Sequence, residues 1–215
     1  ITAAQTESLA DHLMWQLDML KLTPLEYEVG AHLIGNIDDD GFLVTSINEL
    51  LELQQGLYGK IIKKHKKGEL PELPEVDTDL CNLKFQSSKT SHKKKNRQDN
   101  DPSLNEDSTP IDEETEKPEI LTPACAFVES VLNKIQQFNP NGVGARSLQE
   151  SLLIQLGMLG EGDSLSSRIV KNDMQFLESK DLKKIARRQK QDIEKVIDSY
   201  RLIMSLEPKP GREFI

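Results

Sequence analysis

The stretch from Asn36 to Gly41 carries the most suggestive set of metal-binding side chains in the sequence. It reads Asn-Ile-Asp-Asp-Asp-Gly, which places oxygen ligands at alternating positions and a glycine at the sixth, as in a calcium-binding loop. Such a loop starts with aspartate and needs a bidentate glutamate at its twelfth position, where this sequence has Ile47. We therefore interpret the stretch as a tight polar turn and expect no metal there.

Other residue types that carry chemistry are present, but not in the spacing that the chemistry requires. The histidines of the chain are His12, His32, His65 and His92. They share no metal-ligand spacing, and Gly142 and Gly144 lack the third glycine and the preceding strand of a dinucleotide-binding loop. No serine or cysteine lies in a recognisable nucleophile motif. We expect a protein that is not an enzyme and that binds no cofactor.

Residues 182–206 are compatible with a DNA-binding helix-turn-helix. A short helical segment precedes a longer one, and basic side chains such as Arg187 and Arg188 lie between them. The longer segment begins with Asp192 and Glu194, which are acidic where a recognition helix would meet DNA. We favour an ordinary helical bundle with a basic corner, and a DNA-binding regulator stays as the alternative function.

The charge of the chain is concentrated in one stretch. The formal net charge is −9. Between Asp99 and Glu119 lie nine acidic residues and one basic residue, Lys117, so this stretch holds −8 of the total. The rest of the chain is close to neutral, which is not typical of a domain that grips DNA by its phosphates.

Cysteine usage and the lack of targeting patterns favour a reducing, cytoplasmic setting. The two cysteines, Cys81 and Cys125, form neither a metal-binding spacing nor a disulfide framework. No apolar run is long enough to cross a bilayer, so we expect no membrane partner. Residues 1–4 lack the basic start and apolar core of a signal peptide. The abrupt start suggests a domain excised from a longer protein.

Three amphipathic helices are expected in the first quarter of the chain. The first spans residues 6–20, and Trp15, beside its leucine stripe, is interpreted as a packing residue. Thr23 opens the second helix with a capping box, and Ser46 caps the third. The stripe of the first helix consists of Leu9, Leu13, Leu17 and Leu20.

The helical pattern ends at about Gln54 and is absent as far as Glu119. Two lysine-rich blocks precede the acidic tract, and Pro71 and Pro74 interrupt any helix between them. Charge blocks of this kind bury too little apolar surface to offset the entropy of ordering. We predict a long, charged, disordered insertion over residues 56–118. A helical scaffold that recruits partners through this insertion is a further hypothesis.

Helical periodicity returns at Thr122 and Pro123 and continues to the end of the chain, with Gly157 as the expected stop of one helix. No segment shows the alternation of a strand. The predicted fold is all-α, with two helical subdomains built as bundles and separated by the insertion. The expected parts are a first helical part (1–55), the insertion (56–118), a helical hairpin (119–160) and a C-terminal helical bundle (161–215).

A proline and two glycines shape the junction inside the expected hairpin. Pro140 cannot continue the incoming helix, and Gly142 and Gly144 allow backbone angles that are closed to other residues. Ser147 and Glu150 are expected to form a capping box for the next helix. Local physics alone predicts a well-made loop between two packed helices.

Four motifs in order along the chain resemble the core-binding domain of bacterial sigma-54 factors. They are residues 9–17, the aspartate turn within 33–43, the Gly-Val-Gly-Ala-Arg loop within 138–150, and the Pro-Lys-Pro-Gly segment within 206–212. Together they cover nearly the whole chain outside the insertion. The insertion is longer and more charged than is usual in this family, and Ser151 stands where a cysteine is common.

The resemblance implies a transcription initiation factor that binds core RNA polymerase and directs it to promoters. This chain would be the middle of such a factor, and it would attach the factor to polymerase by surface complementarity. It would link an activator-responsive region to a promoter-reading region. An ATP-hydrolysing activator and promoter DNA would be contacted mainly by those two regions, which this chain does not include.

The signature residues of these motifs are the candidates for partner binding. They are Asp38, Asp40, Gly41, Gly142, Val143, Gly144, Arg146, Lys209, Pro210 and Gly211. Arg146 is expected to bind either a helix C-terminus within the domain or a carboxylate on polymerase. Pro210 and Gly211 are expected to set the exit angle toward the next domain.

Overall fold

The computed structural model describes residues 7–71, 73, 80–83 and 118–214. Their helices are α1 (Leu9–Met19), α2 (Pro24–Ile34), α3 (Ile47–Leu53), α4 (Gln55–Lys66), η1 (Leu80–Asn82), α5 (Pro118–Ile135), α6 (Leu148–Met158), α7 (Leu165–Glu178), α8 (Leu182–Gln189), α9 (Ile193–Met204) and η2 (Pro210–Phe214). Only two isolated bridges give this part of the chain any β-pairing, which confirms the all-α class. None of its helices is long and apolar enough to span a membrane.

The first three helices each begin at a side chain that caps them. Ser8, Thr23 and Ser46 accept a hydrogen bond from the backbone N–H three residues further on, and the acidic residue at that position bonds back. A cap of this kind stabilises a helix by about 1 kcal/mol, because the first turn otherwise leaves its N–H groups unpaired. The caps predicted at Thr23 and Ser46 are confirmed.

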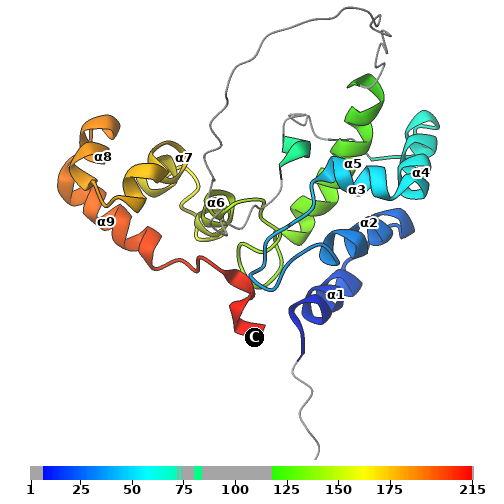
Figure 1. Ribbon diagram of the computed structural model, residues 1–215, viewed down its shortest axis with the longest axis horizontal. Coiled ribbons are helices and arrows are strands. Elements are labelled where there is room, and N and C mark those ends of the chain that lie inside the picture. The colour runs from blue at the N-terminus through cyan, green and yellow to red at the C-terminus, as the bar shows by residue number, and fades with distance from the viewer. Residues whose placement is uncertain (1–6, 72, 74–79, 84–117, 215) are drawn as a thin grey trace, which may run out of the picture.

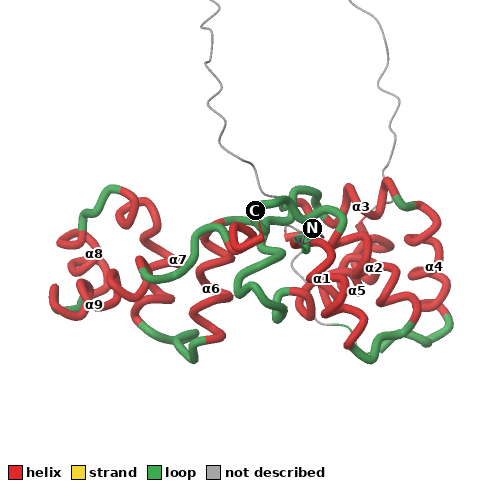
Figure 2. The backbone as a smooth tube through the Cα atoms, turned by 90° about the horizontal axis from the view of Figure 1, so that it is seen from below, coloured by secondary structure: helices red, strands yellow, loops and turns green. Residues whose placement is uncertain are grey.

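The helices form two bundles with separate cores. Apolar side chains of α1 to α5 build the first core, and those of α6 to α9 build the second. Figures 1 and 2 show α1 to α5 and α7 to α9 at opposite ends of the molecule, with α6, η2 and the long loops between them. The expectation of two helical subdomains is confirmed.

The structure divides the chain differently from the expected hairpin over residues 119–160. Helix α5 packs against α2, α3 and α4, whereas α6 packs against α7. Val128 and Leu132 of α5 are fully buried in the first core, and Leu156 of α6 is fully buried in the second. The boundary between the bundles therefore lies in the loop between α5 and α6, because each helix buries its apolar stripe against different partners.

Helix α4 lies inside the range 56–118, so the predicted start of the disordered insertion is wrong. Leu57 and Ile61 are one helical turn apart, and both are buried in the first core, with 2% and 0% of their surface exposed. The basic residues of α4 concealed this stripe, because a helix needs only a few apolar side chains on one face to pack. The acidic tract up to Lys117 lies outside the described residues, and Glu119 lies in α5.

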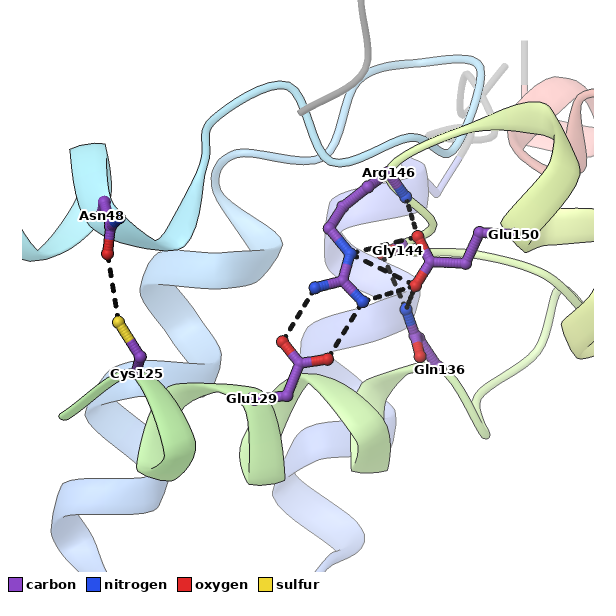
Figure 3. A network of polar contacts seen from close by, with 7 residues as sticks. All are labelled: Asn48, Cys125, Glu129, Gln136, Gly144, Arg146 and Glu150. Atoms are coloured by element: carbon purple, nitrogen blue, oxygen red, sulfur yellow. Dashed lines mark hydrogen bonds and ion pairs between the residues drawn. The ribbon is translucent and has the colours of Figure 1, made fainter. Parts of the chain in front are cut away.

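The two cysteines lie together in the first bundle. The thiol of Cys125 donates a hydrogen bond to Asn48 Oδ1 at 3.1 Å, which links α5 to α3 (Figure 3). A hydrogen bond with the buried Cys81 and burial itself raise the pKa of the Cys125 thiol well above its usual range. The short segment around η1 is thereby attached to the first bundle.

Three local expectations also differ from the structure. Trp15 is 53% exposed and is not a packing residue, because it lies beside the buried stripe of α1. Helix α6 continues through Gly157 to Met158, since one glycine costs a helix only about 1 kcal/mol. Pro123 lies inside α5 and does not mark its start.

Candidate functional site at the junction of three motifs

The aspartate turn is closed by its own first carboxylate. Asp38 Oδ1 accepts a hydrogen bond from the backbone N–H of Phe42 at 2.8 Å. The backbone N–H of Gly41 donates to the carbonyl oxygen of Asp38 at 2.9 Å, and the N–H of Asp38 donates to the carbonyl of Phe42 at the same distance. Asp38 thus stabilises a tight polar turn, as predicted, and its side chain is used within the turn itself.

The loop that contains Gly144 pairs with this turn through the backbone. The N–H of Gly144 donates to the carbonyl oxygen of Gly41 at 2.9 Å, and the N–H of Leu43 donates to the carbonyl of Ala145 at 3.0 Å. Phe42 and Ala145 form an isolated parallel bridge. Two motifs that are about a hundred residues apart in the sequence are therefore joined in one short ladder.

The closing Pro-Lys-Pro-Gly segment also contacts the aspartate turn. Lys209 Nζ lies 2.6 Å from Asp40 Oδ2, and the N–H of Gly211 donates to the carbonyl oxygen of Asp40 at 3.0 Å. A Cβ atom at position 211 would lie 2.2 Å from the carbonyl oxygen of Asp39, so only glycine fits there. All three signature motifs meet at this junction, and the exit angle predicted for Pro210 and Gly211 stays a prediction.

Arg146 is the centre of a buried ion-pair network (Figure 3). Its Nη1 and Nη2 lie 2.9 and 3.0 Å from the carboxylate oxygens of Glu129 on α5. Its Nε and Nη2 also donate to Glu150 on α6, with a shortest distance of 2.6 Å. The side chains of Arg146 and Glu129 are only 6% and 8% exposed. Arg146 therefore ties the helices of the two bundles together.

The environment of Arg146 keeps it charged. Burial alone would lower the pKa of the guanidinium, but the hydrogen bonds and charges of Glu150 and Glu129 outweigh burial and raise that pKa above its ordinary value. Both options predicted for Arg146 differ from this arrangement: its partners are two carboxylates of the domain, and neither is a helix C-terminus. With its donors used internally, the guanidinium is not presented to an outside carboxylate.

Glu150 takes a different role from the one predicted. Ser147 Oγ accepts from the N–H of Glu150 at 3.1 Å, so the serine caps α6. The Glu150 carboxylate does not return to Ser147 but accepts the backbone N–H of Arg146 at 2.6 Å. Only half of the expected capping box forms, because the adjacent guanidinium attracts the carboxylate more strongly than a neutral N–H does.

The backbone of Gly142 and the side chain of Val143 are also packed inside the protein. Gly142 has a positive φ of 89°, and a Cβ atom there would lie 2.5 Å from Ser151 Oγ. That hydroxyl donates to the Gly142 carbonyl at 3.0 Å, which gives a structural reason for a small polar residue at position 151. Val143 is fully buried in the first core.

Three polar residues that complete the junction were missed in the sequence. Gln136 Nε2 donates to the Gly144 carbonyl at 3.2 Å. Gln155 exchanges two hydrogen bonds with the backbone of Glu207, at 2.8 and 3.0 Å, and so holds the closing segment against α6. Glu129 lies beside the apolar stripe of α5, and Gln136, seven residues later, directly follows the end of that helix. Polar residues on one face of a buried helix were the signal that could have identified them.

The carboxylates at the junction are used to hold its segments together. The carboxylates of Asp38, Asp40, Glu129 and Glu150 all bond to donors of the same chain. Among the described residues no group of three His, Cys, Asp or Glu side chains is placed to hold a metal ion. The charged signature residues therefore link the motifs to one another.

Comparisons with known proteins identify the same family as the motifs do. The family model described as "Sigma-54 factor, core binding domain" matches residues 1–69 and 103–215. The chain is 26% identical over 213 residues to the RNA polymerase sigma-54 factor of Xanthomonas euvesicatoria, covering 98% of this chain and 31% of that protein. It is 27% identical over 210 residues to the RNA polymerase sigma-54 factor of Azotobacter vinelandii, covering 96% of this chain and 29% of that protein.

The match extends over most of the sequence, including all three motifs that meet at the junction. The chain spans about a third of the length of the curated relatives that it matches. The order of the motifs, their convergence in space and the family match lead to one conclusion: the chain belongs to the sigma-54 factor core binding domain family.

Proposed function

We propose that this chain is the polymerase-binding module of a sigma-54-type transcription initiation factor. The observation that carries the proposal is the match of the core binding domain model to residues 1–69 and 103–215. Its mechanism is surface complementarity with core RNA polymerase in the bacterial cytoplasm. No bond is made or broken, so the module is no enzyme and needs no cofactor.

The internal bonds of the signature residues support a module in which these residues hold the structure together and other side chains contact polymerase. Arg146 and Asp40 bond within the chain, so they fix the relative position of the bundles and leave recognition to outward-facing side chains. In this proposal the junction is a scaffold that presents two helical surfaces at once. Promoter DNA and an ATP-hydrolysing activator would be met mainly by other parts of the factor.

The outer face of α1 is the surface that we propose for polymerase. Trp15 and Met19 are one helical turn apart and are 53% and 66% exposed. The following residue, Leu20, is 39% exposed. Large apolar side chains grouped on a surface are typical of binding sites, and tryptophan is enriched among the residues that dominate binding energy.

The test is capture of purified core RNA polymerase on the immobilised chain. We expect the wild type to bind and the double substitution Trp15→Ala with Met19→Ala to weaken binding at least about tenfold, which corresponds to roughly 1.4 kcal/mol. The matched control is Leu53→Ala with Met204→Ala, which removes apolar side chains of 76% and 63% exposure from other helices. It should bind as the wild type does.

Two outcomes would contradict different parts of the proposal. A wild-type chain that fails to retain polymerase would remove the function itself. Equal binding by the wild type and the α1 variant would leave the function and exclude α1 as the surface. Circular dichroism of each variant checks that the helices are intact. We expect wild-type spectra, because every substituted side chain is exposed.

A further inference from the structure

A dense basic surface lies on α8, away from the junction. Residues 180–190 carry six basic side chains and one acidic side chain, Asp181. The basic residues are Lys180, Lys183, Lys184, Arg187, Arg188 and Lys190, and all are exposed. Figures 1 and 2 show α8 at the outer end of the second bundle, far from α1 to α5. We call these six residues the α8 basic face.

Two of these cations are held in place by the protein. Arg188 donates through Nε to Asp173, whose side chain is fully buried, while Arg188 itself stays 52% exposed. Lys184 Nζ lies 4.2 Å and Arg188 Cζ 5.4 Å from the centre of the Phe176 ring. Because the bond to Asp173 uses Nε, the Nη groups of Arg188 keep donors for another acceptor. An anchored guanidinium loses little entropy when it binds an anion.

The backbone at both ends of α8 adds a second observation. Lys180 and Lys190 have φ values of 57° and 51°, in the left-handed region. Glycine or asparagine usually takes such positions, and another residue costs about 1 kcal/mol there. A lysine at each position keeps a cation at each end of the helix at the expense of backbone stability.

The packing around α8 resembles that of a helix-turn-helix, but only one of its two contact surfaces suits DNA. Helices α7, α8 and α9 pack against one another in pairs, and a short turn joins α8 to α9. In such motifs the first helix crosses the phosphate backbone and the second enters the major groove. Here the start of α9 carries the exposed acids Asp192 and Glu194, which repel phosphates.

We propose that the α8 basic face binds the phosphate backbone of duplex DNA without reading its sequence. A helix of eight residues is about 12 Å long, and duplex DNA presents about seven charges over that length. The charge density and the fork of Arg188 both fit phosphate. This contact goes beyond polymerase binding and does not depend on it. The chain as a whole is negative, so attraction to phosphate must come from local basic surfaces such as the α8 basic face.

The test measures binding of the full 215-residue chain to fluorescent duplexes of two unrelated sequences by anisotropy, over about 50–200 mM salt. We expect equal affinities for the two duplexes and a salt dependence that corresponds to about three or four phosphate contacts. The variant Lys183→Ala with Arg187→Ala should weaken binding and reduce the salt slope by about two. The bond to Asp173 and the contacts with the Phe176 ring come from Lys184 and Arg188, which this variant leaves unchanged.

The matched control is Lys63→Ala with Lys66→Ala on α4. It removes the same charge from exposed lysines of the other bundle, and it should bind DNA as the wild type does. The inference is overturned if the α8 variant keeps wild-type affinity, or if the α4 control loses as much. Polyglutamate that binds as tightly as DNA would assign the face to an acidic protein instead. A chain that captures polymerase but does not bind DNA would contradict this inference and leave the proposed polymerase binding intact.

Discussion

At Gly211 the closing segment and the aspartate turn approach each other so closely that no side chain fits between them. A Cβ atom there would meet the Asp39 carbonyl oxygen at 2.2 Å and the Gly41 nitrogen at 2.8 Å. Both neighbours are backbone atoms, which cannot rotate away as a side chain can. The contact therefore fixes the distance between two segments that are far apart in sequence.

We expect Gly211→Ala to lower the free energy of unfolding by about 1–3 kcal/mol, because an added methyl group must displace backbone. Urea denaturation followed by circular dichroism measures this. Gly59→Ala is the control: nothing lies within 4 Å of a Cβ atom at that position of α4, and it should raise stability by about 0.5–1 kcal/mol. Unchanged stability of Gly211→Ala would show that the closing segment does not hold this contact.

At the scale of single elements, α4 is where the charge pattern of the sequence was most misleading. Its lysines match those of a solvated tract, yet Ile61 is fully buried against the first core. Composition over a long window averages such a stripe away, whereas a helix packs on the strength of two or three apolar positions. The helix caps, in contrast, were predicted correctly from the sequence, because Thr23 and Ser46 bond to N–H groups only three residues away.

Ile61→Ala is expected to lower the free energy of unfolding by about 2–5 kcal/mol, because it leaves a cavity in the first core. Hydrogen exchange of the α4 amides should accelerate with it. Lys63→Ala, two residues away and exposed, should leave both unchanged within roughly 0.5 kcal/mol. Fast exchange of α4 in the wild type would argue against a packed helix.

The ion pair between α2 and α5 makes stability depend on pH. Lys134 Nζ lies 2.6 Å from Glu26 Oε1. Burial opposes ionisation of this carboxyl, but hydrogen bonds from Lys134 and Thr23 outweigh burial and lower the pKa of Glu26 below the ordinary 4.5. A lowered folded-state pKa stabilises the fold above the unfolded pKa, and that stability is lost as pH falls through the folded value.

We therefore expect the wild type to lose more stability than Glu26→Gln as pH falls from 4.5, because glutamine does not titrate. Urea midpoints measured from neutral pH downward give the two curves. They should be separated most at neutral pH and should converge in acid. Parallel curves across this range would show that Glu26 is not stabilised by Lys134.

At the scale of the whole molecule, Arg146 connects the two bundles through charged side chains of both. It bonds to Glu129 in the first bundle and Glu150 in the second. Removing one member of a buried ion pair costs about 3–5 kcal/mol, because the other charge stays buried without a partner. Because Arg146 bonds to both bundles, this loss of stability weakens the connection between them as well as each core.

Arg146→Gln is expected to separate the unfolding of the two bundles. The single tryptophan of the chain, Trp15, lies in the first bundle, so its fluorescence follows that bundle while circular dichroism follows both. The two transitions should coincide in the wild type and diverge in the variant. Arg201→Gln, which breaks a pair whose side chains are 75% and 73% exposed, should change neither transition measurably. Coincident transitions in Arg146→Gln would mean that other contacts couple the bundles.

The sequence by itself determined the helical class, most of the helix starts and the family motifs, because caps and apolar periodicity act within a few residues. Only the tertiary structure decided that Asp40, Gly144 and Gly211 lie at one junction, that Arg146 bonds inward, and that α5 and α6 belong to different cores. These facts depend on contacts between residues that are far apart in the chain. A periodic pattern shows that a face is buried, but it carries no information about which partner covers it.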